Sequence, residues 1–228
     1  MPDSALAKRD PDPVETEIKL FATSPAPLRM LAGLPWLGPL QLGTPETFLE
    51  LDRYLDTDDA RLAAVMWACR LRWRSGTYVI SLKGPPVAAN GSLGGALHRR
   101  PEIEGPAFGF LDPDSWPPSP ARGRLLELTG GQPLHERFAL RQRRTRRSVS
   151  DGTTRVGTLS LDRVLVILRG EPAGGLSCVE LELEPRTDLP REDDAARLLA
   201  DLLAVGGLTI EPLTKLERAM ALLDRAQN

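Results

Sequence analysis

Charged side chains recur at every second position in several short segments, and their signs are sorted by segment. In an extended strand this spacing places them on one face, opposite a row of apolar side chains. One kind of face carries carboxylates: Glu15 and Glu17, followed by Lys19, and much later Glu180, Glu182 and Glu184. Another kind carries bases: Arg70, Arg72 and Arg74, with Lys83 in phase on the next predicted strand.

Rows of like charge repel one another unless an ion of opposite sign lies above them. Carboxylates suit hard cations such as Mg²⁺ or Mn²⁺, whereas the arginine fork binds phosphate oxygens in pairs and lysine adds point charges. The rows therefore indicate complementary walls of one cavity, with the acids holding a divalent cation and the bases a polyanion. The alternative is that each row is the solvent face of an ordinary sheet.

Other catalytic arrangements find little support in the sequence. Cys69, Cys178, His98 and His135 lack the spacing of a zinc site, and no histidine completes a Ser/His/Asp arrangement. We expect both thiols to be buried, and His98 to be either a proton carrier or a packing residue near the cavity rim. The glycine-rich segment 84–95 lacks the G-K-[ST] ending of a P-loop, which favours a hairpin loop near the cavity mouth.

Composition narrows the class of protein. The chain has 228 residues, with 29 basic and 31 acidic side chains, and this near-balance argues against a nucleic-acid-coating surface. No apolar run approaches the length that crosses a bilayer. Residues 1–13 read as a disordered lead-in without the apolar core of a secretory signal. We expect a cytoplasmic protein with neither nucleic-acid nor membrane partners.

The elements that position the charged rows belong to an α+β chain with about eight, mostly antiparallel, strands. Besides the strand at Glu15, strands are predicted over 49–54, 70–74, 78–83, 138–149, 155–161, 164–169 and 178–184. Helices are predicted over 25–38, 59–68, 192–205 and 216–226. Residues 106–133 read as a proline- and glycine-rich insertion with a short helical pattern at 124–128.

Taken in order, these segments resemble the CYTH family, also called triphosphate tunnel metalloenzymes. The resemblance runs from Val14 to about Leu222, and the stretch 94–102 is similar to that of bacterial inorganic triphosphatases. The other motifs are Glu15-x-Glu17-x-Lys19, Tyr54-x-Asp56-Thr57, Arg70-x-Arg72, Ser81-x-Lys83-Gly84, 138–144 with Leu161-Asp162, Glu180-x-Glu182-x-Glu184 and Thr214-Lys215. Thr214 stands where serine is usual, and Cys69 where leucine is common.

The resemblance implies an eight-stranded antiparallel β-barrel that forms a tunnel, with helices packed outside. The domain would cover residues 14–228, with no companion helical phosphate-binding domain after it. The metal-side acids would be Glu15, Glu17, Glu180, Glu182 and Glu184, with Asp162 either holding a metal or orienting a base. The phosphates would be bound by Lys19, Arg70, Arg72, Lys83, Arg100, Arg144 and Lys215, and catalysis would involve Glu15, Glu17, Lys19, Arg70 and Arg72.

The function implied is hydrolysis of inorganic triphosphate, or of a short polyphosphate, with Mg²⁺ or Mn²⁺. Relatives with the same tunnel leave two enzymatic alternatives, a class IV-type adenylate cyclase and a thiamine or nucleoside triphosphatase. A non-catalytic module that binds polyphosphate or nucleotide is a third alternative. The partner would be a small-molecule triphosphate or polyphosphate, and the chain would be a monomer or a homodimer.

The segment 141–147 holds more arginine than the family resemblance requires. Strand parity predicts that Arg144 and Arg146 face the tunnel and that Arg141, Arg143 and Arg147 face outward. The outward set would form either a solvated face or an anion-docking patch.

Overall fold

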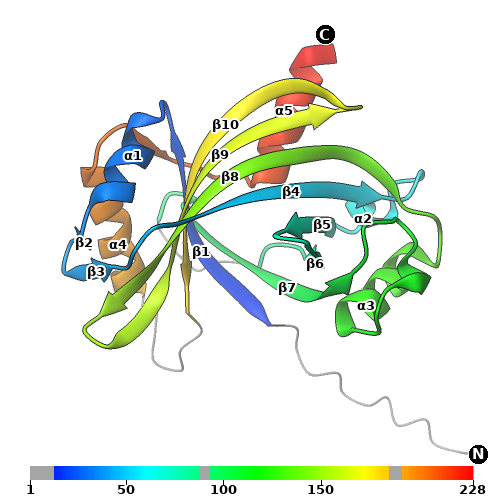
Figure 1. Cartoon of the computed structure of the whole chain (residues 1–228), viewed down its shortest axis with the longest axis horizontal. Helices are drawn as coiled ribbons and strands as arrows, with labels where there is room; N and C mark the ends of the chain where they lie inside the picture. Colours follow the sequence, from blue (N-terminus) through cyan, green and yellow to red (C-terminus); the bar gives the residue numbers. More distant parts are fainter. Residues whose placement is uncertain (1–12, 88–92, 185–191, 228) are drawn as a thin grey trace, which may run out of the picture.

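The computed structural model describes residues 13–87, 93–184 and 192–227. Eight antiparallel strands close into a barrel in the order β8-β4-β5-β6-β7-β1-β10-β9, and β9 pairs with β8 again (Figure 1). They are β1 (Val14–Ala22), β4 (Glu46–Asp56), β5 (Ala68–Arg74), β6 (Thr77–Lys83), β7 (Leu97–Ala107), β8 (His135–Asp151), β9 (Thr154–Leu168) and β10 (Glu171–Leu183). The expected α+β fold with an eight-stranded antiparallel barrel is confirmed.

Shorter elements extend the sheet and cover the barrel. Strands β2 (Trp36–Leu37) and β3 (Leu40–Leu42) continue the sheet beyond β8, and β11 (Leu208–Ile210) pairs with β1. The remaining elements are α1 (Ala26–Gly33), α2 (Arg61–Ala64), η1 (Pro113–Ser115), α3 (Pro120–Thr129), α4 (Glu192–Ala204) and α5 (Lys215–Gln227). None of the helices in the described ranges combines the length and the apolar run that crossing a bilayer requires.

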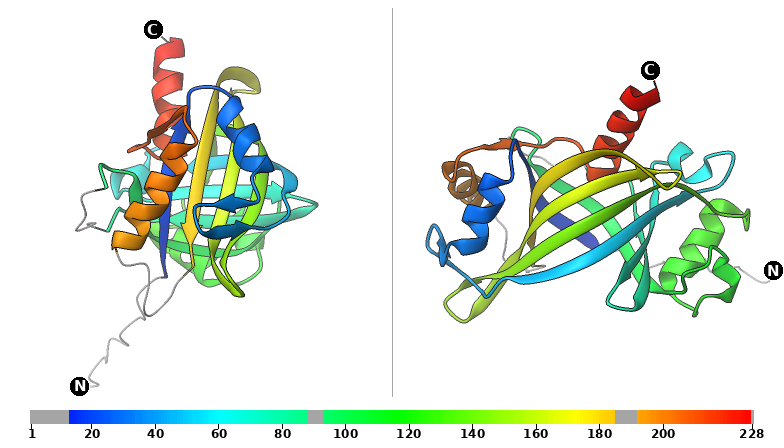
Figure 2. Two further views of the ribbon diagram at one scale, coloured as in Figure 1. Left: turned by 90° about the vertical axis from the view of Figure 1, so that its left-hand side faces the viewer. Right: turned by 45° about the horizontal axis from the view of Figure 1, so that its top comes forward.

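The apolar cores lie largely outside the barrel, because the inner face of most strands carries polar side chains. Ile18 and Leu181, on the outer faces of β1 and β10, pack in one core with Leu31 of α1 and Leu202 of α4. These two helices lie together at one end of the molecule (Figure 2). A second core lies on the outer faces of β5, β6 and β7, under α2 and α3.

Helix α5 packs differently from the other helices. Its residues Ala219 and Leu223 contact Leu140, Val166 and Cys178, which project from the inner faces of β8, β9 and β10. The helix therefore covers the apolar end of the barrel interior. Its first turn faces the remaining, polar part of that interior.

Several predicted boundaries were wrong. The strands predicted over 155–161 and 164–169 are one strand, β9, because Asp162 is buried inside the barrel rather than in a turn. The helix predicted over 59–68 has only the four residues of α2, and the helix predicted over 25–38 ends at Gly33. Strand β7 was not predicted, because Pro101 and Pro106 interrupt its pattern.

Parts of two predicted segments lie outside the residues that the structure describes. They are residues 1–12 of the expected lead-in and residues 88–92 of the expected hairpin loop.

Arg147 does not belong to either kind of surface expected for it. Its side chain points away from the cavity, but it is buried beneath the segment that joins α1 to β3. The guanidinium donates hydrogen bonds to the backbone carbonyls of Leu31, Ala32, Leu34, Leu42 and Gly43, at 2.5–3.1 Å. Arg147 is therefore a structural link, whereas Arg141 and Arg143 are exposed.

Candidate active site

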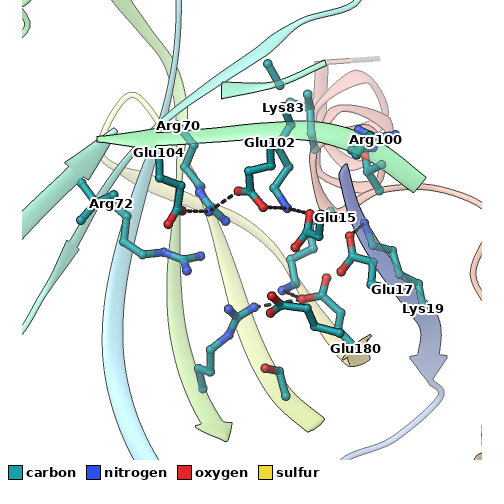
Figure 3. Close-up of a pocket in the computed structure, with 18 of the residues that line it drawn as sticks. Glu15, Glu17, Lys19, Arg70, Arg72, Lys83, Arg100, Glu102, Glu104 and Glu180 are labelled. Carbon is teal, nitrogen blue, oxygen red and sulfur yellow. Dashed lines mark hydrogen bonds and ion pairs between the residues drawn. The ribbon is translucent and has the colours of Figure 1, made fainter. Parts of the chain in front are cut away.

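A cavity of about 240 Å³ opens inside the barrel, and charged side chains provide most of its lining (Figure 3). All eight barrel strands and the first turn of α5 contribute to it. The period of two that alternates side chains across each strand delivers the predicted charged rows into one enclosed space. The cavity is therefore the place where their chemistry has to be sought.

The carboxylates gather on three neighbouring strands, β7, β1 and β10. Glu17 of β1 lies directly opposite Glu182 of β10, and Glu15 lies opposite Arg100 of β7. The acidic wall consists of Glu15, Glu17, Glu102, Glu104, Glu180 and Glu182. Glu102 and Glu104 were missed in the sequence, because the prolines of β7 obscured its alternation.

The bases lie mainly across the cavity from these acids. Arg70, Arg72 and Arg74 project from β5, Lys83 from β6, and Arg144 and Arg146 from β8. Lys215 enters from α5, while Lys19 and Arg100 stand on the acidic strands themselves. All seven predicted phosphate-binding residues line the cavity, so the two walls are complementary but not fully separated by sign.

Lysines form ion pairs with several of the carboxylates. Lys83 Nζ lies 2.5 Å from Glu15 and 3.2 Å from Glu102, and Lys19 Nζ lies 2.7 Å from Glu17. Within the residues that the structure describes, no three Asp, Glu, His or Cys side chains stand in a metal-binding arrangement. A metal ion would have to displace lysines from these carboxylates.

The pKa values of the acids show where burial and neighbouring carboxylates together outweigh the nearby bases. Burial, together with the charges of Glu17 and Glu102, raises the pKa of Glu15 to about 8. Burial and the same two neighbours also raise the pKa of Glu182. By contrast, Lys83 and Arg70 outweigh burial at Glu102 and hold its pKa at about 2.

The surroundings of Glu15 and Glu182 suit a divalent cation. The raised pKa values of Glu15 and Glu182 come from burial first and from their acidic neighbours second, and a cation among them would favour the ionised carboxylates. Their oxygens are the ligands that Mg²⁺ and Mn²⁺ prefer. The acidic wall around Glu15, Glu17, Glu180 and Glu182 therefore fits such an ion in charge and donor type.

Asp162 lies beneath the basic side chains rather than in the cavity lining. It is fully buried and accepts hydrogen bonds from Arg144 Nε and Nη2 at 2.8 and 2.7 Å, and from Lys215 Nζ at 2.5 Å. Glu180 also receives Lys215 at 2.8 Å and Arg144 at 3.0 Å. These contacts favour the orienting role of Asp162 over the metal-binding role.

Asp52 orients Arg72 as Asp162 orients Arg144, but it was not predicted from the sequence as a site residue. Its buried carboxylate accepts two hydrogen bonds from Arg72, both at 2.7 Å, and one from Gln142 at 2.5 Å. Glu50 is also buried and lies within 3.3 Å of both Arg72 and Arg74. The sequence did contain an indication of both acids, because Glu50 and Asp52 alternate with apolar residues in the strand predicted over 49–54.

Two candidates lie outside the cavity lining. Glu184, just beyond the end of β10, pairs with Arg155 at 2.9 Å and is not brought together with Glu180 and Glu182. His98 is half-buried, and its Nε2 lies 3.0 Å from the backbone carbonyl of Glu211.

The chain is similar in sequence and fold to known proteins. A profile of the CYTH domain family matches residues 14–218. A candidate adenylyl cyclase from Hippeastrum, described as having a dominant triphosphatase activity, is 21% identical with a TM-score of 0.63; the match covers 91% of this chain and 95% of that one.

Two further solved structures share the fold. A candidate adenylate cyclase from Bacillus halodurans is 19% identical with a TM-score of 0.57, over 90% of this chain and 97% of that one. A protein from Pyrococcus horikoshii OT3 is 19% identical with a TM-score of 0.54, and the match covers 92% of this chain and 99% of that one. No curated protein sequence matches.

Proposed function

The chain belongs to the CYTH domain family, and we propose that it is a divalent-metal-dependent triphosphatase that hydrolyses inorganic triphosphate inside its barrel. The observation that carries the proposal is a single cavity in which the acidic wall of β7, β1 and β10 faces the bases of β5, β6 and β8. A site that only binds anions has no need of so many carboxylates facing its ligand. The triphosphatase activity of the Hippeastrum relative supports the same reaction class.

The phosphate chain would lie along the basic side chains. Arg70, Arg72 and Arg144 present guanidinium forks that can each bind two phosphate oxygens. Their carboxylate partners hold these forks in place before substrate arrives, which favours catalysis by positioning. The first turn of α5, with Lys215, also lines the cavity and adds the favourable end of a helix dipole.

The acidic wall would hold the cation. A bound Mg²⁺ or Mn²⁺ would supply charge neutralisation and a more acidic water. Glu15, Glu17, Glu180 and Glu182 are the residues whose position and charge fit this role. With a cation on these carboxylates, Lys19 and Lys83 would no longer pair with Glu17 and Glu15 and could bind phosphate oxygens, where they would offset the negative charge that develops during cleavage. Lys215 keeps Asp162 as a partner, at 2.5 Å.

The cavity lining favours an inorganic substrate over a nucleotide. Tyr54 is the one aromatic side chain among the described lining residues. Its ring is stacked on Phe138, with centroids 4.8 Å apart, so one of its two faces is already covered. The names of the Hippeastrum and Bacillus relatives keep adenylate cyclase as the second candidate.

Phosphate release from triphosphate with Mg²⁺ or Mn²⁺ tests the proposal, with Glu15→Gln, Glu182→Gln and Glu184→Gln as variants. We expect the first two to lose about a hundredfold or more in kcat/KM, because charge that stabilises the transition state is removed. Glu184→Gln is the matched control, since Glu184 lies outside the cavity. Mn²⁺ binding, measured calorimetrically, should weaken in the same two variants and not in the control.

The outcomes separate the hypotheses. Unimpaired phosphate release by both Glu15→Gln and Glu182→Gln would contradict the proposal that the acidic wall binds the metal. Cyclic AMP and diphosphate as products from ATP would favour the cyclase. Tight binding of triphosphate without turnover under either metal would favour a binding module.

A further inference from the structure

A second basic surface lies on the outside of the barrel. It consists of Arg29 of α1, Arg141 and Arg143 of β8 and Arg163 of β9, and we refer to it as the outer arginine face. All four side chains are exposed. Figure 2 shows that β4, β8 and β9 run side by side here and that α1 borders one side of them.

Two adjoining hollows mark this face. The first, of about 520 Å³, is lined by Arg141, Arg143 and Arg163. The second, of about 420 Å³, is lined by Arg29 and shares Arg143 and Arg163 with the first. None of the described residues that line either hollow is Asp or Glu.

The charge on this face is uncompensated. Arg143 and Arg163 are directly opposite each other in the pairing of β8 with β9, an arrangement that is unfavourable for like charges. Over the described part of the chain, no carboxylate lies within ion-pair distance of the four arginines. The arginines of the cavity differ, because Arg70, Arg72 and Arg144 all face carboxylates.

The chemistry of the face suits phosphate. Guanidinium forks bind phosphate oxygens in pairs, and the hydroxyls of Thr23, Ser24 and Ser177 also line the first hollow. Nucleic acid fits less well, because single strands are usually held by stacking their bases on aromatic rings. Phe21 is the aromatic residue of the described lining, and the Arg218 guanidinium lies over its ring at 4.6 Å.

We propose that the outer arginine face binds a chain of inorganic polyphosphate, at a site separate from the tunnel. The uncompensated pair Arg143 and Arg163 is the centre of the site, since both hollows share it. A linear polyanion can follow the two hollows and relieve the repulsion between these arginines. This site does not depend on the reaction proposed for the cavity.

The experiment measures binding of long-chain inorganic polyphosphate to the full chain in EDTA, which prevents metal-dependent turnover. The test variant is R143Q/R163Q, and the control is R197Q/R225Q, which removes two exposed arginines from α4 and α5. We expect affinity to fall about tenfold or more in R143Q/R163Q and to stay within about twofold of wild type in the control. Thermal melting verifies that both variants fold.

A tunnel variant, R70Q/R72Q, separates the two sites. We expect it to keep long-chain binding, and we expect R143Q/R163Q to keep wild-type hydrolysis of triphosphate. Equal losses in the test and control variants would overturn the proposal, as would loss of long-chain binding in R70Q/R72Q alone. A single-stranded oligonucleotide that binds as tightly and depends on the same arginines would overturn polyphosphate as the partner.

Discussion

Asp52 and Asp162 hold the guanidinium groups of the cavity from behind. Each accepts two hydrogen bonds from one arginine, Arg72 or Arg144, so the planar fork is fixed before a phosphate arrives. Both aspartates are buried, which leaves the arginines as the groups that reach the cavity. At the scale of single residues, the site therefore has an inner layer of arginines that line the cavity and a second layer of buried aspartates that orient them.

Replacing Asp52 with Asn tests this second layer. The substitution keeps the shape but removes the buried charge that faces Arg72 and Arg70. Leaving these partly buried arginines short of a counter-charge should cost about 3 kcal/mol in the free energy of unfolding. Urea denaturation measures this loss, and KM for triphosphate should rise with it. Asp59→Asn is the control, since the pair of Asp59 with Arg61 is exposed; an equal loss in both variants would contradict the argument.

Glu15 makes stability depend on pH in an unusual direction. Below its ordinary pKa of 4.5, the carboxyl is protonated in both the folded and the unfolded chain and has no effect. Between this pH and about 8, the folded chain keeps the proton that the unfolded chain has lost, so stability falls as pH rises. Glu15→Gln should therefore gain stability relative to wild type across this range.

Thermal melting of the metal-free proteins at a series of pH values measures that difference. Two melting curves that stay parallel from about pH 4.5 to about pH 8 would refute the raised pKa of Glu15. Added Mg²⁺ should narrow the difference at the upper end of the range, because a cation beside Glu15 favours its ionised form.

The tunnel-facing rows were predictable at this scale, whereas their partners were not. Alternation placed Glu15 with Glu17, and Arg70 with Arg72, on shared strand faces, and the family resemblance predicted that these faces point inward. It did not show that lysines pair with the glutamates or that Asp162 lies behind Arg144, because these contacts join strands that are distant in sequence. Glu184 shows the limit of parity, since it keeps the alternation of β10 yet lies past the end of that strand.

Arg147 connects elements rather than ligands. Its guanidinium donates hydrogen bonds to five backbone carbonyls and so holds the segment from the end of α1 to β3 against β8. Backbone carbonyls that lose a buried donor carry a desolvation penalty.

Arg147→Met should therefore lower the free energy of unfolding by about 3 kcal/mol in urea denaturation. Arg143→Met, four residues earlier on the same strand, is the matched control, because its exposed side chain should change stability by about 0.5 kcal/mol at most. Amide exchange should also speed up in α1 and β3 of the Arg147 variant. Equal stability of the two variants would show that the carbonyl contacts contribute little.

At the scale of elements, the sequence predicted strands better than helices. The long strands β8 and β10 have clear alternation, and α4 and α5 have clear apolar spacing. The segment that became β7 has prolines, so only its pairing with β6 and β1 shows that it is a strand. The start of the short helix α2 is held by Asp56, whose carboxylate accepts hydrogen bonds from the backbone N–H groups of Leu62 and Ala63.

Over the whole molecule, the barrel places a polar interior between apolar outer cores. The eight-stranded closure was expected from the family resemblance and is confirmed, but composition and alternation alone did not require it. An open sheet with solvated charged faces would give the same pattern of residues. Closure through β8 and β9 is what turns those faces into a cavity.

This architecture predicts that cation and triphosphate stabilise the molecule together more than either does alone, because each offsets the charge of one wall. Ligand at about a hundred times its Kd contributes about 2.7 kcal/mol, which for a chain of this length corresponds to a rise in Tm of about 5–10 °C. Thermal melting with Mg²⁺, triphosphate or both measures the effect. Purely additive small shifts would argue against a shared site.

Strand β1 lies between β7 and β10, so both sides of the acidic wall depend on pairings between distant parts of the chain. Such pairings are slow to form, since a long loop must be closed before any contact is gained. The sequentially adjacent hairpins β5-β6 and β8-β9-β10 can form earlier, and they carry all the cavity arginines except Arg100, together with Glu180 and Glu182. We therefore expect the basic side of the tunnel to be assembled first during folding, and the metal-holding side to be completed only when β1 brings in Glu15 and Glu17 and closes the barrel.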